Sequence, residues 1–158
     1  MTRVDLNNNV NQSEYPKLTY KNGTYHVQGY QSFDIDKQKI CNPRRKLLEK
    51  SIVVKSVIDK NQKKCKTLLD IGCSQGYYSY YANFKNYQVT SIEHDPYYVN
   101  QMKTINKKLN FNIDIQNNKF SQIEESKYDI VLFLAIIHWV YNSTEKYNSF
   151  DKILDKLF

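Results

Sequence analysis

The chain of 158 residues has little of what indicates a disulfide framework, a zinc site or a membrane span. Its three cysteines, Cys41, Cys65 and Cys73, form no C-x-x-C pair and no cluster with histidine, which excludes the usual disulfide and zinc patterns. The longest apolar run, 130–137, is far shorter than the ~20 residues that a membrane-spanning helix needs. The N-terminal segment lacks the apolar core of a secretory signal and carries Asp5, an acid that transit peptides avoid. We therefore expect one cytoplasmic domain.

Arginine is also scarce, and this bears on how the net charge of +7 is interpreted. Of the 23 basic residues only 3 are arginine and 20 are lysine, while asparagine, isoleucine and tyrosine are abundant at 17, 14 and 14. An AT-rich coding sequence produces this bias without selection for phosphate binding. A basic surface does attract nucleic acid through counterion release, but here the charge is only weak evidence for such a partner.

The first 60 residues form a tail followed by two small elements. We predict a mobile polar tail over 1–16, then a hairpin and a helix over 17–60. Asn22-Gly23 is the strongest short-range hairpin signal, and the packing candidates around it are Leu18, Tyr20, Tyr25 and Val27. The helix is expected to begin at Pro43, with an apolar face formed by Leu47, Leu48, Ile52, Val54, Val57 and Ile58.

Strands and helices alternate from residue 61 onward. Strands are expected at 66–71, 87–92, 111–115 and 128–134. Helices are expected at 77–84, after the cap Asp95 with Pro96 in the first helical position, and at 147–158. This alternation predicts a parallel sheet with right-handed crossovers. The fold class is therefore α/β, with a Rossmann-like, mostly parallel sheet that carries helices on both faces, in a core over 61–158.

The predicted helix at 77–84 is unusual because it carries four tyrosines, Tyr77, Tyr78, Tyr80 and Tyr81. A helix that lies over a sheet needs bulky cover, and the composition supplies tyrosine freely. We expect two of the four to pack in the core and at most one, Tyr77 or Tyr78, to face a pocket.

Ligands of such sheets bind at the carboxyl ends of the strands, so the residues found there carry the functional argument. The first strand runs into Asp70-Ile-Gly-Cys-Ser-Gln-Gly76, and the second ends at Glu93, where an acid can accept both hydroxyls of a ribose. The dinucleotide fingerprint G-x-G-x-x-G would place glycine at positions that are Ser74 and Tyr77 here. This departure disfavours a nucleotide-dependent oxidoreductase.

The spacing D-x-G-x-x-x-G, with an acid after the next strand, resembles motif I and the acidic motif of the class I S-adenosylmethionine-dependent methyltransferases. The family usually shows D-x-G-x-G-x-G, and this chain departs from it at Ser74. The resemblance covers 66–140 and implies S-adenosylmethionine as the cofactor. It places Asp70, Gly72, Cys73, Ser74 and Gly76 around the methionine part, Glu93 on the ribose, His94, Asn117 and Asn118 near the adenine, and Leu134 and Ala135 under the sulfonium.

Methyl transfer from a sulfonium is an in-line displacement that needs positioning, a dry site and, for some acceptors, a base. The segment Ile137-His138-Trp139 resembles the part of the family that faces the substrate, and His138 is the only candidate base. A lone histidine fits a packed structural role equally well. The D/N-P-P-F/Y signature of many amine methylating enzymes is absent, since 134–137 reads Leu-Ala-Ile-Ile. The acceptor stays open among small molecules, RNA and protein.

The family usually has seven strands, whereas this sequence shows four, so the chain looks truncated after the fourth strand. That leaves an apolar strand edge at 128–134, available to a second chain or a second copy. Two hypotheses follow from the residues. One is a methyltransferase with an unknown acceptor, and the other is a catalytically silent methyltransferase-like module that binds a partner subunit or RNA.

Overall fold

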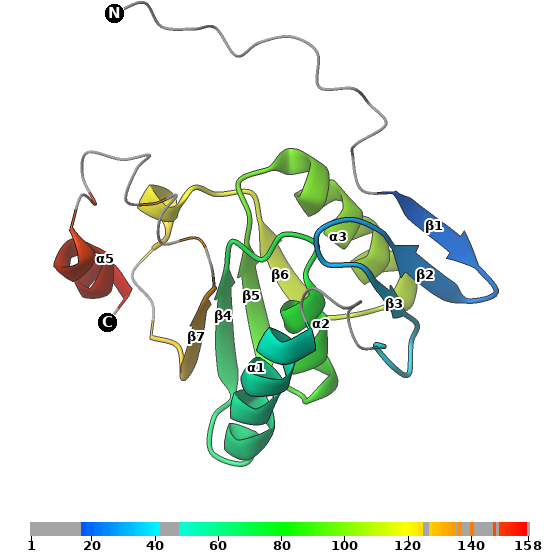
Figure 1. The fold of residues 1–158 in the computed structure, drawn as a ribbon, viewed down its shortest axis with the longest axis horizontal. Helices are drawn as coiled ribbons and strands as arrows, with labels where there is room; N and C mark the ends of the chain where they lie inside the picture. The colour runs from blue at the N-terminus through cyan, green and yellow to red at the C-terminus, as the bar shows by residue number, and fades with distance from the viewer. Residues whose placement is uncertain are drawn as a thin grey trace, which may run out of the picture.

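The structure is a computed structural model that describes residues 17–41, 48–124, 127–134, 136, 140, 147 and 149–157. It contains a three-stranded antiparallel sheet near the N-terminus and a four-stranded parallel sheet with helices packed on it (Figure 1). The predicted tail over 1–16, the helix start at Pro43 and the packing candidate Leu47 lie outside the described residues. None of the described helices is long and apolar enough to cross a bilayer.

The parallel sheet has the strand order β6-β5-β4-β7. Its strands are β4 (Thr67–Ile71), β5 (Gln88–Ile92), β6 (Ile113–Gln116) and β7 (Ile130–Phe133). The four strands that the sequence predicts are all present, and the α/β class is confirmed. In the register, Asp70 of β4 lies opposite Ser91 of β5 and Leu132 of β7, so the carboxyl ends of these strands meet at one edge of the sheet.

The helices occupy the segments between and around these strands. They are α1 (Leu48–Asn61), α2 (Tyr77–Phe84), α3 (Pro96–Leu109), the short 3-10 helix η3 (Phe120–Gln122) and α5 (Phe150–Leu157). The start of α3 is as predicted, because the side chain of Asp95 accepts a hydrogen bond from the Tyr97 amide at 2.8 Å and Pro96 is the first helical residue. Local capping chemistry therefore determines where this helix begins.

Side chains that alternate along the strands build a core on each face of the sheet. Leu68 and Val89 pack on one face with α1, α2, α3 and the N-terminal sheet. Leu69 and Ile71 pack on the other face with η3 and with Ile153 of α5, which is fully buried. Asp70 shares the face of Leu68, and this places its carboxylate beneath α2.

The predicted hairpin is confirmed and gains a third strand. It consists of β1 (Leu18–Lys21) and β2 (Thr24–Val27), joined by Asn22-Gly23, and β2 also pairs with β3 (Phe33–Ile35). The sequence analysis missed β3 because three residues are too few to show a periodic pattern. The sheet lies beside α2 and α3 (Figure 1), and its buried side chains, which join the core of that face, are Tyr25, Val27, Phe33 and Ile35.

Several predicted packing residues are more exposed than expected. Ile52 and Val57 of α1 are 62% and 43% exposed, because α1 buries a narrower line formed by Ser51, Val54 and Ile58. Tyr20 is 48% exposed and leans on the Tyr25 ring with centroids 4.7 Å apart. Predicting one continuous buried face from the spacing of apolar residues was therefore wrong for α1.

The fourth predicted strand is also less enclosed than its apolar sequence indicates. Leu132 is buried, while the other three residues of β7 are only partly buried. Within the described residues β7 pairs with β4 alone and stands at the edge of the sheet. An edge position leaves one row of backbone groups without a neighbouring strand.

Candidate functional site

The carboxyl ends of β4 and β5 bring the predicted acid and the glycine loop into contact. Glu93 directly follows β5 and is 5% exposed. Its Oε2 accepts a hydrogen bond from the Ser74 amide at 2.8 Å, and its Oε1 accepts from the amides of His94 and Asp95 at 2.9 and 3.0 Å. Nδ1 of the exposed His94 ring also lies 3.0 Å from Oε1. One carboxylate therefore joins the loop at 72–76 to the start of α3.

The loop at 72–76 follows a path that depends on two close approaches. A Cβ on Gly72 would lie 2.7 Å from the side chain of Ile136, and a Cβ on Gly76 would lie 2.5 Å from Cε of Met102. Gly76 also has φ +82°, a conformation that favours glycine. Cys73 points into the core, where its Sγ donates to Sδ of Met102 at 3.5 Å, and burial raises the pKa of its thiol. A thiol in this state is a packing group and not a nucleophile.

Asp70 lies beneath this loop in a chain of buried hydroxyls. Ser79 of α2 donates to its Oδ2 at 2.7 Å, and Ser91 of β5 donates to the Ser79 hydroxyl at 2.8 Å. All three side chains are at most 3% exposed. Burial raises the pKa of the Asp70 carboxyl to about 6, an effect that the Ser79 hydrogen bond opposes and the charge of Glu93 reinforces. Asp70 thus links β4, α2 and β5.

The residues after β6 reach the same edge of the sheet. Nδ2 of Asn117 donates to the main-chain oxygens of Glu93 and His94, both at 2.9 Å. Nδ2 of Asn118 donates to Oε1 of Gln116 at 3.2 Å. Beside them lies a cavity of about 190 Å³ lined by Ile92, Gln116, Asn118, Gln122, Ile123, Glu124 and Tyr128. Asn117 therefore braces the Glu93 segment, whereas Asn118 lines the cavity.

All four tyrosines of α2 are buried, so the prediction that only two pack in the core was wrong. The helix lies between the main sheet, α1 and the N-terminal sheet, and it has no solvent face wide enough for these rings. Tyr80 and Tyr81 donate their hydroxyls to the Met102 carbonyl and to Asp59. The hydroxyls of Tyr77 and Tyr78 are buried without a hydrogen-bond partner among the described residues, and burial, with nearby Asp70, raises the pKa of Tyr78 to about 12.

The remaining predicted site residues follow β7. Leu134 directly follows the strand and is partly buried. Ala135 and the candidate base His138 lie outside the described residues. In the described part of the chain, no three histidine, cysteine or acidic side chains group as metal ligands would.

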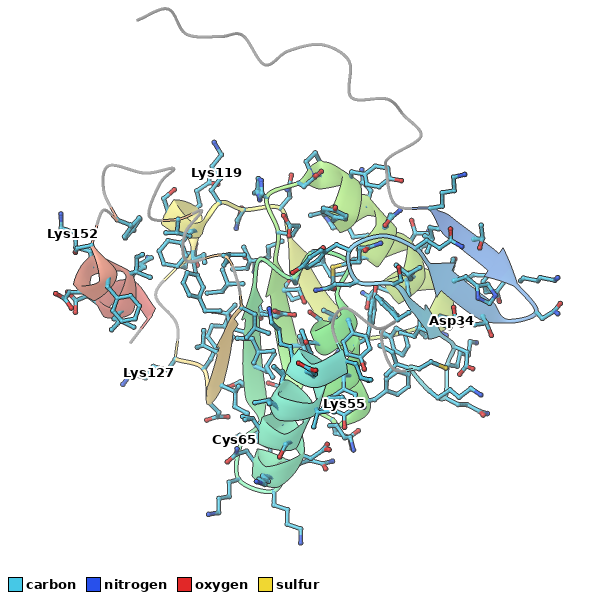
Figure 2. All side chains as sticks on the ribbon, viewed as in Figure 1. Asp34, Lys55, Cys65, Lys119, Lys127 and Lys152 are labelled. Atoms are coloured by element: carbon cyan, nitrogen blue, oxygen red, sulfur yellow. The ribbon has the colours of Figure 1, made fainter. Side chains whose placement is uncertain are left out.

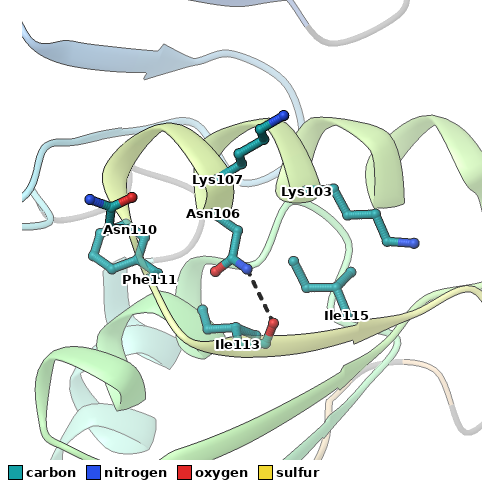
Figure 3. A pocket seen from close by; sticks show the side chains of 7 residues that line it. All are labelled: Lys103, Asn106, Lys107, Asn110, Phe111, Ile113 and Ile115. Carbon is teal, nitrogen blue, oxygen red and sulfur yellow. Dashed lines mark hydrogen bonds between the residues drawn. The ribbon is translucent and has the colours of Figure 1, made fainter.

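A larger cavity of about 390 Å³ lies along α3 and the edge strand β6, away from the loop at 72–76. Its lining residues are Lys103, Asn106, Lys107, Asn110, Phe111, Ile113 and Ile115. Figure 3 shows Asn106 donating to the main-chain oxygen of Ile113, a bond of 3.2 Å that fixes α3 on β6. Lys107, one of the two lysines of this cavity, lies in the last turn of α3, where a positive charge interacts favourably with the helix dipole. We interpret this cavity as a surface groove that is separate from the site.

Several side chains that shape the site were missed by the sequence analysis. Ser79 and Ser91 carry a detectable signal, since each is a polar residue in an otherwise buried segment. Gln31 and Gln75 carry none, because glutamine is common on surfaces and no motif marks either position. Both are buried here, and they connect the N-terminal sheet to the loop at 72–76.

A family model described as a methyltransferase domain matches residues 62–157. The chain belongs to this methyltransferase family. No curated protein sequence matches it significantly. The bifunctional kinase-methyltransferase WbdD is similar in structure, with a TM-score of 0.58 at 16% identity over 72% of this chain and 27% of that chain. The PH0226 protein from Pyrococcus horikoshii has a TM-score of 0.55 at 15% identity over 69% of this chain and 50% of that chain. The fold is that of a class I methyltransferase, and the chain spans less than two thirds of the length of these neighbours.

Proposed function

We propose that this methyltransferase domain binds S-adenosylmethionine at the loop over 72–76 and transfers its methyl group to an acceptor that is a small molecule, an RNA or a protein. The observation that carries the proposal is the hydrogen bond from the Ser74 amide to Glu93. It joins a glycine-containing loop after one strand to a buried acid after the next, the arrangement that suits a nucleoside with a polar tail. The proposed contact residues are Asp70, Gly72, Cys73, Ser74, Gly76, Glu93, His94, Asn117, Asn118, Leu134 and Ala135.

The chemistry of the side chains present fits this cofactor. Among the described residues, Oε2 of Glu93 receives one hydrogen bond, so it retains capacity to accept another from a ribose hydroxyl. The main-chain amides that hold both carboxylate oxygens fix their directions before a ligand arrives. The neighbouring cavity is lined by carboxamides of Gln116 and Asn118, which offer both donors and acceptors to a purine edge.

S-adenosylmethionine supplies an electrophilic methyl group on a sulfonium when it is bound. The negative charge of Glu93 favours a cationic ligand at these strand ends. Because burial raises the pKa of the Cys73 thiol, this sulfur stays protonated and does not compete with the acceptor as a nucleophile. We assign His138, on the sequence argument alone, as the base for acceptors that lose a proton during transfer.

The open edge of β7 supports a further part of the proposal, association with a second chain or a second copy. Within the described residues this strand pairs only with β4 and its four residues are apolar. An unpaired apolar edge favours the addition of another strand. Light scattering over a concentration series measures this association, and a monomer at every concentration would contradict self-association.

Calorimetric titration with S-adenosylmethionine and S-adenosylhomocysteine tests the cofactor site. In Glu93→Gln the negative charge is lost and one of the two acceptor oxygens becomes a donating NH2 group, and we expect the Kd to rise about 10-fold to 100-fold, because hydrogen bonds to charged groups contribute ~1.5–3 kcal/mol. Glu49→Gln is the matched control, since Glu49 is an exposed acid in the first turn of α1 and the change in charge is the same. The variant His138→Gln is expected to bind the cofactor like the wild type, because the base acts on the acceptor.

Circular dichroism at the titration temperature shows that each variant is folded. Failure of the folded wild-type chain to bind S-adenosylmethionine would contradict the proposal. A parallel titration with NAD provides the contrast with an oxidoreductase, and binding of NAD alone would favour that class. Equal losses in Glu93→Gln and Glu49→Gln would show that Glu93 is not a ligand.

A further inference from the structure

Hydrogen bonds that involve three glutamines, Gln28, Gln31 and Gln75, join the N-terminal sheet to the loop at 72–76 and to the start of α2. The main-chain amide of Gln31 donates to Oε1 of Gln75 at 3.0 Å, and Nε2 of Gln75 donates to the main-chain oxygen of Gln28 at 3.1 Å. In the opposite direction, Oε1 of Gln31 accepts a hydrogen bond from the Tyr77 amide at 3.1 Å. The contacts join positions 44 to 47 residues apart in the chain.

The Gln31 side chain acts as the cap of α2. The first amides of a helix have no acceptor within the helix, and a side chain at the preceding position usually supplies one. Here that position is Gly76, which has no side chain, and no side-chain cap of its own is present. Gln31 provides the missing oxygen from a separate sheet. Because close packing requires glycine at position 76, the acceptor for the first amide of α2 has to come from elsewhere, and the N-terminal sheet supplies it.

These contacts are enclosed, which makes each of them costly to lose. Gln75 is 1% exposed and Gln31 is 6% exposed. A buried amide or carbonyl that loses its partner makes no hydrogen bond at all, because folding has already removed the water that it bound in the unfolded chain. Next to these hydrogen bonds the Phe33 ring makes an apolar contact, with its centroid 5.4 Å from that of the Tyr77 ring.

The loop that is held in this way has a backbone that needs support. Gly72, Ser74 and Gly76 have φ of +68°, +52° and +82°, so three of five consecutive residues adopt left-handed conformations. For serine this conformation is unfavourable by about 1–2 kcal/mol, so tertiary contacts must maintain it. Ser74 is also the residue whose amide reaches Glu93. Its conformation therefore bears directly on the candidate cofactor site.

We propose that Gln31 and Gln75 are positioning residues, through which the N-terminal sheet holds the loop at 72–76 in the conformation that accepts the cofactor. This inference rests on the proposed function. A ligand that binds a preorganised loop does not have to order it. Loss of the glutamine hydrogen bonds therefore weakens binding without removing any contact to the ligand.

The test compares Gln31→Met and Gln75→Met, which keep the side-chain length and remove the hydrogen bonds, with the wild-type chain. Calorimetry with S-adenosylhomocysteine is expected to show a Kd about fivefold higher for each variant, the equivalent of one lost helix cap of ~1 kcal/mol. Hydrogen exchange at the amides of 73–77 is expected to accelerate, while exchange in β4 and β5 stays unchanged. Gln31→Glu retains an oxygen at the cap and is expected to bind close to the wild type.

The matched control is His26→Ala, which breaks the 2.8 Å pair between His26 and Asp34 within the same N-terminal sheet. Asp34 lies on the flank of this sheet (Figure 2). The control is expected to lower thermal stability slightly and to leave the Kd and the exchange of 73–77 unchanged.

The possible results separate the two claims. If the folded wild-type chain binds no S-adenosylhomocysteine, the proposed function fails and the positioning role fails with it. If the wild type binds and the methionine variants bind equally well, the glutamines only stabilise the fold and the positioning role alone is overturned. If exchange at 73–77 does not change in these variants, the N-terminal sheet does not hold the loop, and the inference is also overturned.

Discussion

The buried carboxyl of Asp70 predicts how the stability of this protein depends on pH. Asp70 is 3% exposed and accepts a hydrogen bond from Ser79, and burial raises its pKa to about 6 from an ordinary value of 3.8. The folded state therefore holds the proton more tightly than the unfolded state does. Between pH ~4 and ~6 the unfolded chain releases this proton first, so the free energy of unfolding falls as the pH rises through this window.

The magnitude follows from the size of the shift. A difference of about 2 pKa units, at 1.36 kcal/mol for each unit, corresponds to about 3 kcal/mol. Asp70→Asn has no proton to release and keeps an oxygen that Ser79 can donate to. The free energy of unfolding of the wild type minus that of Asp70→Asn should therefore be largest below pH ~4. It should fall by about 3 kcal/mol as the pH rises to ~6 and stay constant above that pH.

Urea unfolding followed by circular dichroism, at several pH values from 4 to 7, measures this difference for both chains. Asp114→Asn reports the effect of losing an exposed carboxylate from the same sheet. Ser79→Ala removes a hydrogen bond that lowers the pKa of Asp70, so it should move the window to higher pH. Parallel stability curves for the wild type and Asp70→Asn would refute the reasoning, because they would mean that Asp70 titrates alike in the folded and unfolded states.

Two further predictions concern packing around the loop. Gly76→Ala should destabilise the fold by about 2–4 kcal/mol in urea unfolding, because a left-handed backbone and a Cβ 2.5 Å from Met102 add their effects. Gly23→Ala, at the same φ of +82° but in open space, should lose only about 1 kcal/mol, and equal losses would show that crowding against Met102 is unimportant. Tyr78→Phe should raise the thermal midpoint, since it removes a buried hydroxyl that has no partner among the described residues, and stabilise by about 1 kcal/mol. A lower midpoint would show that this hydroxyl makes a favourable contact.

Elements that depend on local chemistry were predictable from the sequence. The turn at Asn22-Gly23 and the cap at Asp95-Pro96 are both where the residues indicate, because each depends on side chains within a few positions of the backbone it shapes. The strands of the parallel sheet were predictable because they are short segments rich in β-branched residues that alternate with helical segments; β6 alternates apolar and polar residues, and β7 is apolar throughout.

The pairing of Glu93 with the loop at 72–76 was also predictable, for a different reason. In a parallel sheet, the carboxyl ends of sequential strands lie side by side, so spacing along the chain becomes proximity in space. The contact between Glu93 and Ser74 is the result of this topology.

What the sequence alone determined is therefore the four strands of the parallel sheet, the hairpin turn, the start of α3 and the edge of the sheet where we propose the site. Only the tertiary structure decided what surrounds each helix, and so it alone showed that all four tyrosines of α2 are buried and that the predicted face of α1 is partly exposed. The tertiary structure also decided which residue, distant in the sequence, accepts the hydrogen bond from the first amide of α2. Gln31 and the Tyr77 amide that it caps are 46 residues apart in the chain. No periodicity or motif connects these two positions, because their only relation is that their elements pack together.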